Sequence, residues 1–428
     1  MIRVPALVCV CTLALLAACA AGPSPSSTSS GDAIDNDAAP QAAAPCSGKP
    51  STATDGMQPS APQGLRVPAG FRIQTIAQVG DARELAALPN GDLLVATGGS
   101  DVYIIPNAEG ATGKPAGAPH VFATINDRQA EGIAFAAARC EIFVATTNGV
   151  WSIRYKSGDQ TAEKIRRIAK VRTGGIPPHS DGDVHTSTSV TFSNGLVYAS
   201  IGSSCDRCTE IDPTRASIYT MKPGGANFTK RGTRIRNGIA IFTNPASGHV
   251  WIGGAGQDTL PFGHPYEFLD DVSSHTGIAD YGWPECEENH NAFGSGADCS
   301  HTVEPLVELY AYSTIIGGAF YPLDRAGAYA FPAHYRGGIF AAAHGSWHTK
   351  NGNSAAPAQV VFVPMNGDKP KTPMDWNASP TKQWTTFIGG LQAAGTNRRG
   401  RPTGVAVGSK GSLFVADDQD GVIYRVRP

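Results

Sequence analysis

Charged side chains are scarce in this sequence, and the two signs nearly cancel. Lys and Arg number 34 and Asp and Glu 36, which gives a net charge of −2 with charged residues at 16%, below the quarter that is typical of soluble domains. Without an excess of basic residues, the composition gives no electrostatic reason to expect nucleic acid as a partner. The shortage of charge, combined with 50 Gly and 31 Pro, argues against a helical bundle and favours short strands joined by tight turns.

A long apolar run is missing as well. The apolar stretch from Val4 to Leu16 has about 13 residues, which is too short to span a bilayer comfortably and is typical of a secretory signal. Leu16 and the small residues before Cys19 resemble a bacterial lipobox, in which the cysteine is acylated and becomes the mature N-terminus. An ordinary cleaved signal with an incidental cysteine is the alternative. We expect a lipoprotein signal peptide at residues 1–18 and a lipid on Cys19 as the membrane anchor. By resemblance to enteric lipoproteins, Ala20 predicts the periplasmic face of the outer membrane.

Residues 19–66 are mostly Ser, Pro, Ala, Thr and Gly without an apolar period. They predict a flexible tether, which leaves residues 67–428 for the globular part.

The cysteines fit export to an oxidising compartment. Of the nine cysteines, Cys9 and Cys11 leave with the signal and Cys19 carries the lipid, and the six that remain favour disulfides. The expected pairs are Cys205–Cys208, Cys286–Cys299 and, by elimination, Cys46–Cys140. The Cys205–Cys208 spacing also occurs in thioredoxins and in halves of zinc sites. No second such pair and no strand–helix context accompanies it, which favours a structural clip in a loop.

One pattern recurs along the globular part: a turn, usually with glycine, then a short strand, then small residues. The first apolar residues of its six copies are Leu93, Ile142, Leu196, Val250, Ile339 and Leu413. Their spacings are 49, 54, 54, 89 and 74 residues, and about fifty residues is the length of a four-stranded propeller blade. The sequence therefore predicts an all-β, six-bladed β-propeller, with inserted loops in the two long intervals. The alternating stretch Phe71–Ala77 is expected to close the ring against the last blade. A sandwich or barrel is the competing fold, but neither explains the period.

A propeller by itself hosts unrelated functions, so the chemistry has to come from the loops. His185, just before the third repeat strand, is a candidate general base; a structural hydrogen-bonding role is the alternative, and His179 is a rival. Arginines gather in two loops, 234–238 and 398–404, where their planar forks suit carboxylates of a polyanionic ligand. The loop 256–267 offers oxygen ligands for Ca²⁺, although it is no EF-hand.

These segments resemble the PQQ-dependent sugar dehydrogenases, specifically the glucose/sorbosone dehydrogenase family, over most of the globular part. The matching motifs are His185 with its Ser/Thr-rich strand, Ile201-Gly202-Ser203-Ser204-Cys205, Arg236-Asn237, Tyr281-Gly282-Trp283-Pro284, His344-Gly345-Ser346-Trp347, Gly400-Arg401-Pro402 and the strand Leu413–Asp418. Each motif is weak alone, but their order on six blades is specific.

The resemblance implies a PQQ- and calcium-dependent oxidation of an aldose or related sugar. It places His185 as the base that takes the anomeric hydroxyl proton while hydride passes to the quinone. It assigns PQQ binding to Arg236, Asn237, His344, Arg399 and Arg401. Ca²⁺ would be held partly by the backbone carbonyls of Leu260 and Pro261, and the cofactor would supply the hydride chemistry.

The chain also departs from the family. Val184 precedes the base where some relatives have an Asp, Thr188 and Ser189 stand where relatives often carry an Arg, and the Gly-Pro dipeptide of the calcium loop is absent. A propeller that binds a ligand without catalysis is therefore the main alternative. A propeller lactonase is the other, but it needs a converging Glu/Asn/Asp metal set, which the sequence does not reveal. The sugar and the electron acceptor are not determined by the sequence.

Overall fold

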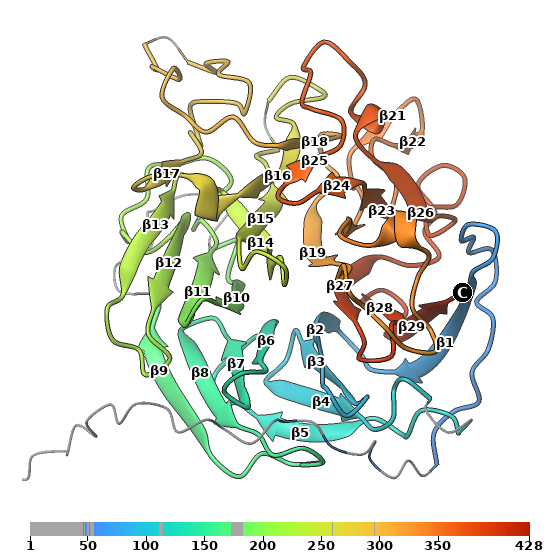
Figure 1. Cartoon of the computed structure of the whole chain (residues 1–428). Coiled ribbons are helices and arrows are strands. Elements are labelled where there is room, and N and C mark those ends of the chain that lie inside the picture. The colour runs from blue at the N-terminus through green and yellow to red at the C-terminus, as the bar shows by residue number, and fades with distance from the viewer. Residues whose placement is uncertain are drawn as a thin grey trace, which may run out of the picture. The chain divides into compact units, whose positions relative to one another are not determined.

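Six antiparallel sheets stand around a common centre, as Figure 1 shows. The structure, a computed structural model, describes residues 46, 48, 51, 55–110, 114–172, 183–258, 260–294 and 296–428. They belong to one compact unit that begins at residue 43. Each sheet has four main strands, so the prediction of an all-β, six-bladed propeller is confirmed.

The first strand of each blade lies nearest the centre and the later strands follow outward (Figure 1). The first blade comprises β2 (Ala82–Ala87), β3 (Leu93–Thr97), β4 (Asp101–Ile105) and β5 (His120–Thr124). The second comprises β6 (Gly132–Ala136), β7 (Glu141–Ala145), β8 (Gly149–Arg154) and β9 (Ile165–Lys170). The third comprises β10 (Thr188–Ser193), β11 (Leu196–Ile201), β12 (Ser217–Met221) and β13 (Thr229–Thr233), with the short β17 (Ala279–Asp280) added in parallel.

The other three blades complete the ring. The fourth comprises β14 (Asn237–Thr243), β15 (Val250–Ala255), β16 (Glu267–Asp271) and β18 (Val307–Leu309). The fifth comprises β19 (Ile315–Phe320), β20 (Ile339–Ala343), β23 (Gln359–Val363) and β26 (Thr385–Ile388). The sixth comprises β27 (Pro402–Val407), β28 (Leu413–Asp417), β29 (Val422–Arg427) and β1 (Arg72–Gln78).

The six repeat segments of the sequence are the second strands of the six blades: β3, β7, β11, β15, β20 and β28. Nearly all of their residues are buried. A strand in this position has a neighbouring blade on each face, which explains why it appears in the sequence as a continuous apolar run rather than as an alternating one.

The ring closes by pairing the two ends of the described chain. β1 pairs antiparallel with β29, with Arg72 opposite Arg427 (Figure 1). This confirms the closing strand predicted from the alternation in Phe71–Ala77. Because the last blade takes one strand from the start of the domain, the ring cannot open without breaking this ladder.

The innermost strands pack against one another in the order β2, β6, β10, β14, β19 and β27, and β27 returns to β2. Glycine permits two of these approaches. A Cβ at Gly132 would lie 2.7 Å from the carbonyl oxygen of Thr188 on the next blade. A Cβ at Gly404 would lie 2.3 Å from the carbonyl oxygen of Arg83. Both distances are too short for a side chain, so these positions need glycine for packing.

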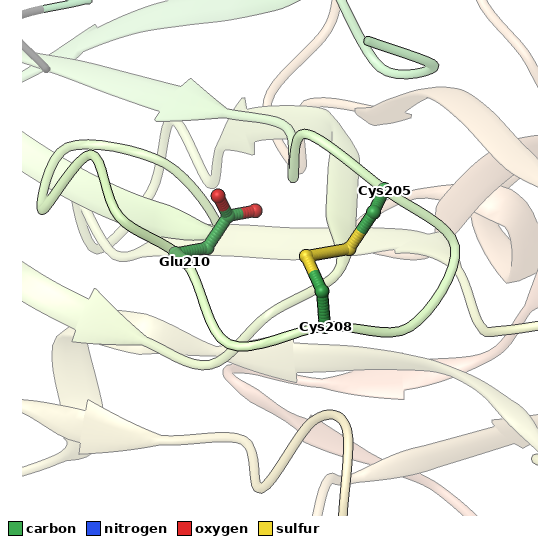
Figure 2. Close-up of side chains that lie close together, drawn as sticks. All are labelled: Cys205, Cys208 and Glu210. Carbon is green, nitrogen blue, oxygen red and sulfur yellow. A yellow bond between two sulfur atoms is a disulfide. The ribbon is translucent and has the colours of Figure 1, made fainter. Parts of the chain in front are cut away.

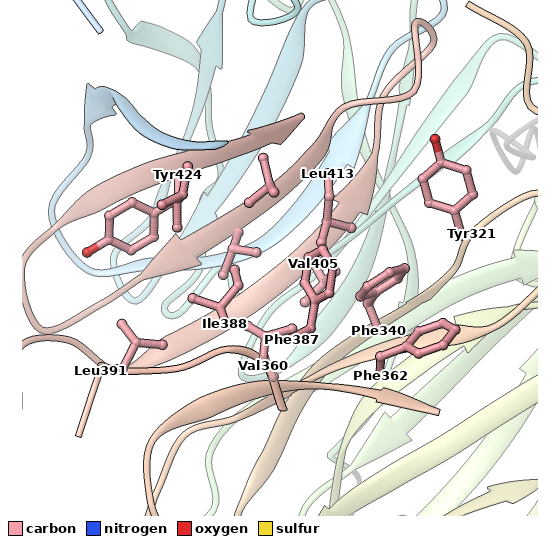
Figure 3. Close-up of a cluster of buried hydrophobic side chains, with 14 of the residues drawn as sticks. Tyr321, Phe340, Val360, Phe362, Phe387, Ile388, Leu391, Val405, Leu413 and Tyr424 are labelled. Carbon is pink, nitrogen blue, oxygen red and sulfur yellow. The ribbon is translucent and has the colours of Figure 1, made fainter. Parts of the chain in front are cut away.

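The hydrophobic core lies between the blades. Figure 3 shows the cluster between the fifth and sixth blades, with Phe340, Phe362 and Phe387 facing Val405 and Leu413. Phe340 and Leu413 are fully buried. Burial of such faces is the main stabilising contribution, because one sheet alone cannot remove its apolar surface from water.

The two long intervals of the repeat contain insertions. The fourth blade is interrupted by the 3₁₀ turn η2 (Val272–Ser274) and by β17. The fifth blade carries the small hairpins β21 (Thr349–Lys350) with β22 (Asn353–Ser354) and β24 (Met365–Asn366) with β25 (Lys369–Pro370), and the 3₁₀ turns η3 (Ala333–Tyr335) and η4 (Pro380–Lys382).

All three expected disulfides are present, namely Cys46–Cys140, Cys205–Cys208 and Cys286–Cys299. Part of the predicted tether pairs with the propeller: Ser60 exchanges backbone hydrogen bonds with Thr75, and Arg66 does so with Gly389. The predicted signal peptide and Cys19 lie outside the described residues. Within the part of the chain that the structure describes, no helix is long and apolar enough to cross a membrane.

Candidate active site

Antiparallel pairing brings distant loops to one end of the ring. Asn237 at the start of β14 pairs with Ala255 at the end of β15, and Pro402 pairs with Asp417 in the same way. Residues just before a first strand and just after a second strand therefore lie at the same end, which we call the site rim. The predicted residues on the site rim are His185, Arg236, Asn237, His344 and Arg401.

His185 and Asn237 approach each other across Gly202. A Cβ on Gly202 would lie 2.7 Å from both the Cβ of His185 and the side-chain oxygen of Asn237. The ring nitrogen Nδ1 of His185 lies 2.8 Å from the hydroxyl of Ser203. Asn237 is buried, and His185 is partly exposed. The two predicted groups therefore share one small space beside the end of β11.

The main chain at His185 is held by a buried ion cluster. Arg215 donates to Asp183 at 2.6 Å and to the carbonyl oxygen of His185 at 3.1 Å. Arg172 donates to the same carboxylate at 2.6 Å and to the same carbonyl at 3.3 Å. Burial opposes ionisation of Asp183, but the two guanidinium groups outweigh it and lower its pKa. Burial also lowers the pKa of Arg172 to about 10, so the arginine keeps its charge at neutral pH.

Arg236 lies buried between two carboxylates. Its guanidinium donates to Asp206 at 2.7 Å and to Asp258 at 3.1 Å. It also donates to the backbone carbonyls of Asp206 and Ala255. Asp258 in turn lies 2.9 Å from Nε2 of His348. The predicted cofactor-binding arginine is thus fixed in position and charge-compensated in this structure.

His344 is buried against an acidic partner. Its Nε2 lies 3.0 Å from both oxygens of Asp418, and Arg83 forms an ion pair with the same carboxylate at 3.3 Å. Burial lowers the pKa of His344 to about 4, despite the opposing effect of Asp418. The imidazole is therefore neutral at physiological pH and donates Nε2–H to Asp418.

The arginines of the last loop separate into two environments. Arg401 donates to the carbonyl oxygens of His344 and Gly345, both at 3.3 Å. Arg398 donates to the carbonyl of Ser346, and the pKa of Arg401 is lowered mainly by burial and further by the charge of Arg398. Arg399 is exposed and donates to the carbonyl of Gly390 at 3.2 Å. The structure thus places Arg398, rather than Arg399, against the same loop as Arg401.

Two further expectations concern the loop residues Leu260 and Pro261. Both lie in a turn, where the Pro261 carbonyl accepts a hydrogen bond from the backbone of His264 at 3.1 Å. Their role in binding Ca²⁺ stays a prediction. His179, the rival base, lies outside the described residues.

A second set of oxygens fits a hard cation. Gln257, Glu267 and Glu288 line one cavity of about 30 Å³ beside Arg236. Each of the three is buried and has one side-chain oxygen without a hydrogen-bond partner among the described residues. Burial raises the pKa of Glu267 to about 8 and that of Glu288 well above its usual range. Ca²⁺ takes carboxylate and amide oxygens as ligands, so the residues that line this cavity form a second candidate site for it.

Sequence reasoning missed several groups at the site rim. Ser203 belongs to a motif that the sequence analysis used for the family resemblance, and Asp206 lies between Cys205 and Cys208. Neither residue was predicted to have a role of its own at the site. Glu267 ended the loop considered for Ca²⁺, and only its burial distinguishes it from an ordinary surface carboxylate. Glu288, in the insertion that follows, had no local signal.

Comparisons with known proteins agree with this architecture. No family model matches the chain. A curated protein of Borreliella burgdorferi, described only as uncharacterized, is 22% identical over 265 residues, which are 60% of this chain and 64% of that protein. The chain therefore matches less than two thirds of the length of that relative.

Solved structures match more completely. The holo form of the pyranose dehydrogenase PQQ domain from Coprinopsis cinerea superposes with a TM-score of 0.68 at 17% identity, covering 86% of this chain and 98% of that one. A calcium structure of a carbohydrate-active enzyme from Trichoderma reesei gives 0.68 at 17% identity, covering 88% and 100%. The soluble aldose sugar dehydrogenase from Escherichia coli, in its apo form, gives 0.57 at 17% identity, covering 84% and 99%. At these identities the likeness establishes a shared fold, and it is consistent with the family resemblance of the sequence.

Proposed function

We propose that this protein is a PQQ- and calcium-dependent dehydrogenase that oxidises an aldose or a related sugar. The observation that carries the proposal is the convergence of His185 and Asn237 on one space at the site rim, with Arg236 fixed at the start of the fourth blade and Arg401 at the start of the sixth. The structural neighbours support oxidoreductase activity on sugars at a general level.

The chain's own residues have distinct tasks in this proposal. PQQ, when bound, supplies the acceptor for the two electrons and the hydrogen that leave the sugar carbon as hydride. His185 accepts the remaining proton, from the sugar hydroxyl. Asn237 donates to a cofactor oxygen, and Arg398 and Arg401 provide positive charge for its carboxylates. Neutral His344 adds a polar contact without a further charge. A separate electron carrier would reoxidise the cofactor.

The calcium requirement is supported by the cavity at Glu267 and Glu288. A cation there would satisfy their unpartnered oxygens and compensate two buried carboxylates beside Arg236. The carbonyls of Leu260 and Pro261 remain our proposal for a cation that contacts the cofactor itself. Calcium removal should therefore weaken both stability and cofactor binding.

The test is reconstitution of the purified protein with PQQ and Ca²⁺, followed by dye reduction with a panel of aldoses. His185→Ala should lower kcat by about 10²- to 10⁴-fold and leave PQQ binding largely intact. His301→Ala is the matched control, because the His301 side chain is 87% exposed. Absence of both PQQ binding and turnover would refute the enzyme proposal.

One observation favours the alternative of a propeller that binds without catalysis. The Arg236 guanidinium is engaged by both Asp206 and Asp258, so a carboxylate ligand has to compete with two internal partners. PQQ binding without turnover on any sugar would select this alternative.

We also propose that the protein is exported and anchored by a lipid on Cys19, at the periplasmic face of the outer membrane. The disulfides support an oxidising destination. Cys19→Ser should move the protein from the membrane fraction to the soluble fraction, and unchanged fractionation would contradict the anchor.

A further inference from the structure

We propose that Ser203 is a positioning residue that fixes the tautomer of His185, so that Nε2 carries the lone pair that accepts the substrate proton. The inference deepens the proposed function and rests on it for the role of His185. The tautomer itself can be measured without any cofactor or substrate.

The direction of the hydrogen bonds follows from counting protons on one hydroxyl. The Ser203 hydroxyl donates to the backbone carbonyl of Cys205 at 2.7 Å, and a carbonyl can only accept. A serine hydroxyl has a single proton, so both contacts are hydrogen bonds only if the hydroxyl accepts from Nδ1 of His185 at their 2.8 Å contact. The ring therefore donates Nδ1–H, and in the neutral imidazole Nε2 holds the lone pair.

Ser203 itself is held rigidly. Its side chain is fully buried. Its backbone N–H donates to the carbonyl of Arg236 at 2.7 Å, and its own carbonyl accepts from Arg215 at 2.6 Å. Gly202 before it leaves no room for a Cβ next to His185. The hydroxyl therefore keeps one orientation relative to the ring.

The acceptor that orients Ser203 belongs to the Cys205–Cys208 disulfide loop. Figure 2 shows this loop with Glu210, whose carboxylate lies within 4.8 Å of both sulfur atoms. Glu210 accepts from the backbone N–H of Ser204 at 2.6 Å and from its hydroxyl at 2.7 Å. The Cys205–Cys208 cross-link restricts the loop to which the Cys205 carbonyl belongs. The same loop supplies Asp206, the partner of Arg236.

Two arginines and a carboxylate lie at the main chain of His185. Arg172 and Arg215 donate to its carbonyl oxygen, and both also pair with the carboxylate of Asp183. In the described contacts, the partner of the ring nitrogen Nδ1 is the neutral hydroxyl of Ser203. A neutral partner orients the ring without adding a negative charge next to the base.

The experiment measures the ring directly. The full chain, labelled with ¹⁵N in its histidines, is studied by long-range ¹H–¹⁵N correlation above the pH at which His185 is charged, and His185→Ala assigns the signal. In the wild type we expect the proton of the neutral His185 ring on Nδ1. In Ser203→Ala we expect this preference for Nδ1 over Nε2 to be lost. Ser204→Ala is the matched control, because Ser204 is equally buried but binds Glu210, and it should keep the wild-type tautomer. An Nε2–H signal in the wild type, or an unchanged tautomer in Ser203→Ala, would overturn the proposal.

Kinetics separates this inference from the proposed function. Ser203→Ala should lower kcat about tenfold, as expected for loss of one orienting hydrogen bond, with KM and PQQ affinity nearly unchanged. Ser203→Asp should restore the orientation but place a charge beside the base, which should move the acid limb of the kcat/KM profile to higher pH. A general structural defect would change KM and PQQ affinity as well, and would not shift that limb. If neither the wild type nor any variant oxidises a sugar, the proposed function is wrong, and Ser203 then has no role in turnover. The NMR spectra would still decide whether Ser203 fixes the tautomer of His185.

Discussion

Replacing His344 with glutamine should remove a pH dependence of stability that the wild-type protein shows in mildly acidic solution. His344 is 6% exposed, and burial lowers its pKa from an ordinary 6.5 to about 4. Between these two values the unfolded chain binds a proton at this residue and the folded chain does not. The contribution of the neutral imidazole is therefore fully present above pH 6.5 and is lost progressively as the pH falls towards 4.

The size of the effect follows from the displacement of the pKa. Each pH unit between the two pKa values corresponds to about 1.4 kcal/mol, so the His344 contribution amounts to about 3 kcal/mol at most. The pKa of Asp418, the partner of His344, is lowered, so its own contribution is lost only at more acid pH. Glutamine can still donate to Asp418 but does not titrate.

The assay is urea denaturation of both proteins at several pH values from about 4 to 7.5, with disulfides intact. Carboxyl groups with raised pKa, such as Glu131, titrate in both proteins and cancel in the difference. The free energy of unfolding of the wild type minus that of His344→Gln should fall by up to about 3 kcal/mol from pH 6.5 to 4. His301→Gln, at a side chain that is 87% exposed, should show no such trend. A difference for His344→Gln that is independent of pH would refute the reasoning.

Three further predictions concern other parts of the fold. Replacing both Cys46 and Cys140 with serine opens a cross-link over a sequence separation of 94 and should lower the free energy of unfolding by up to about 4–5 kcal/mol; equal denaturation midpoints would contradict this. Glu267→Gln should weaken calcium binding at least tenfold in calorimetry and abolish the rise in melting temperature on adding Ca²⁺; unchanged affinity would remove Glu267 from the site. Gly202→Ala should lower kcat severely, because its Cβ would lie 2.7 Å from that of His185, and wild-type turnover would show that the site can relax.

The blade count could be predicted because of where the repeat strands lie. β3, β7, β11, β15, β20 and β28 are each covered on both faces, so they are apolar along most of their length. That requirement repeats with every blade and therefore appears as a period in the sequence. The closing strand was visible in the sequence as an alternation of side-chain types, although in the structure the register of β1 shifts between Thr75 and Ala77, so that Ile76 and Ala77 are both buried.

The candidate site was predicted only in part. The sequence drew attention to His185, Arg236, Asn237, His344 and Arg401, and the structure brings them to one rim. It did not distinguish Arg398 from Arg399, which are adjacent in the chain but lie in different environments. Successive residues in an extended loop point to opposite sides, so the path of the backbone decides which arginine faces the rim.

By itself, then, the sequence determined the all-β class, the six blades and their closure, and it suggested the cysteine pairing that the structure shows. These properties follow from local periodicity and from residue counts. Only the tertiary structure decided that Ser203 contacts His185, and that Gln257, Glu267 and Glu288 leave unpartnered oxygens in one cavity. Hydrogen-bond direction and burial are set by neighbours that are distant in the chain, and no local pattern encodes them.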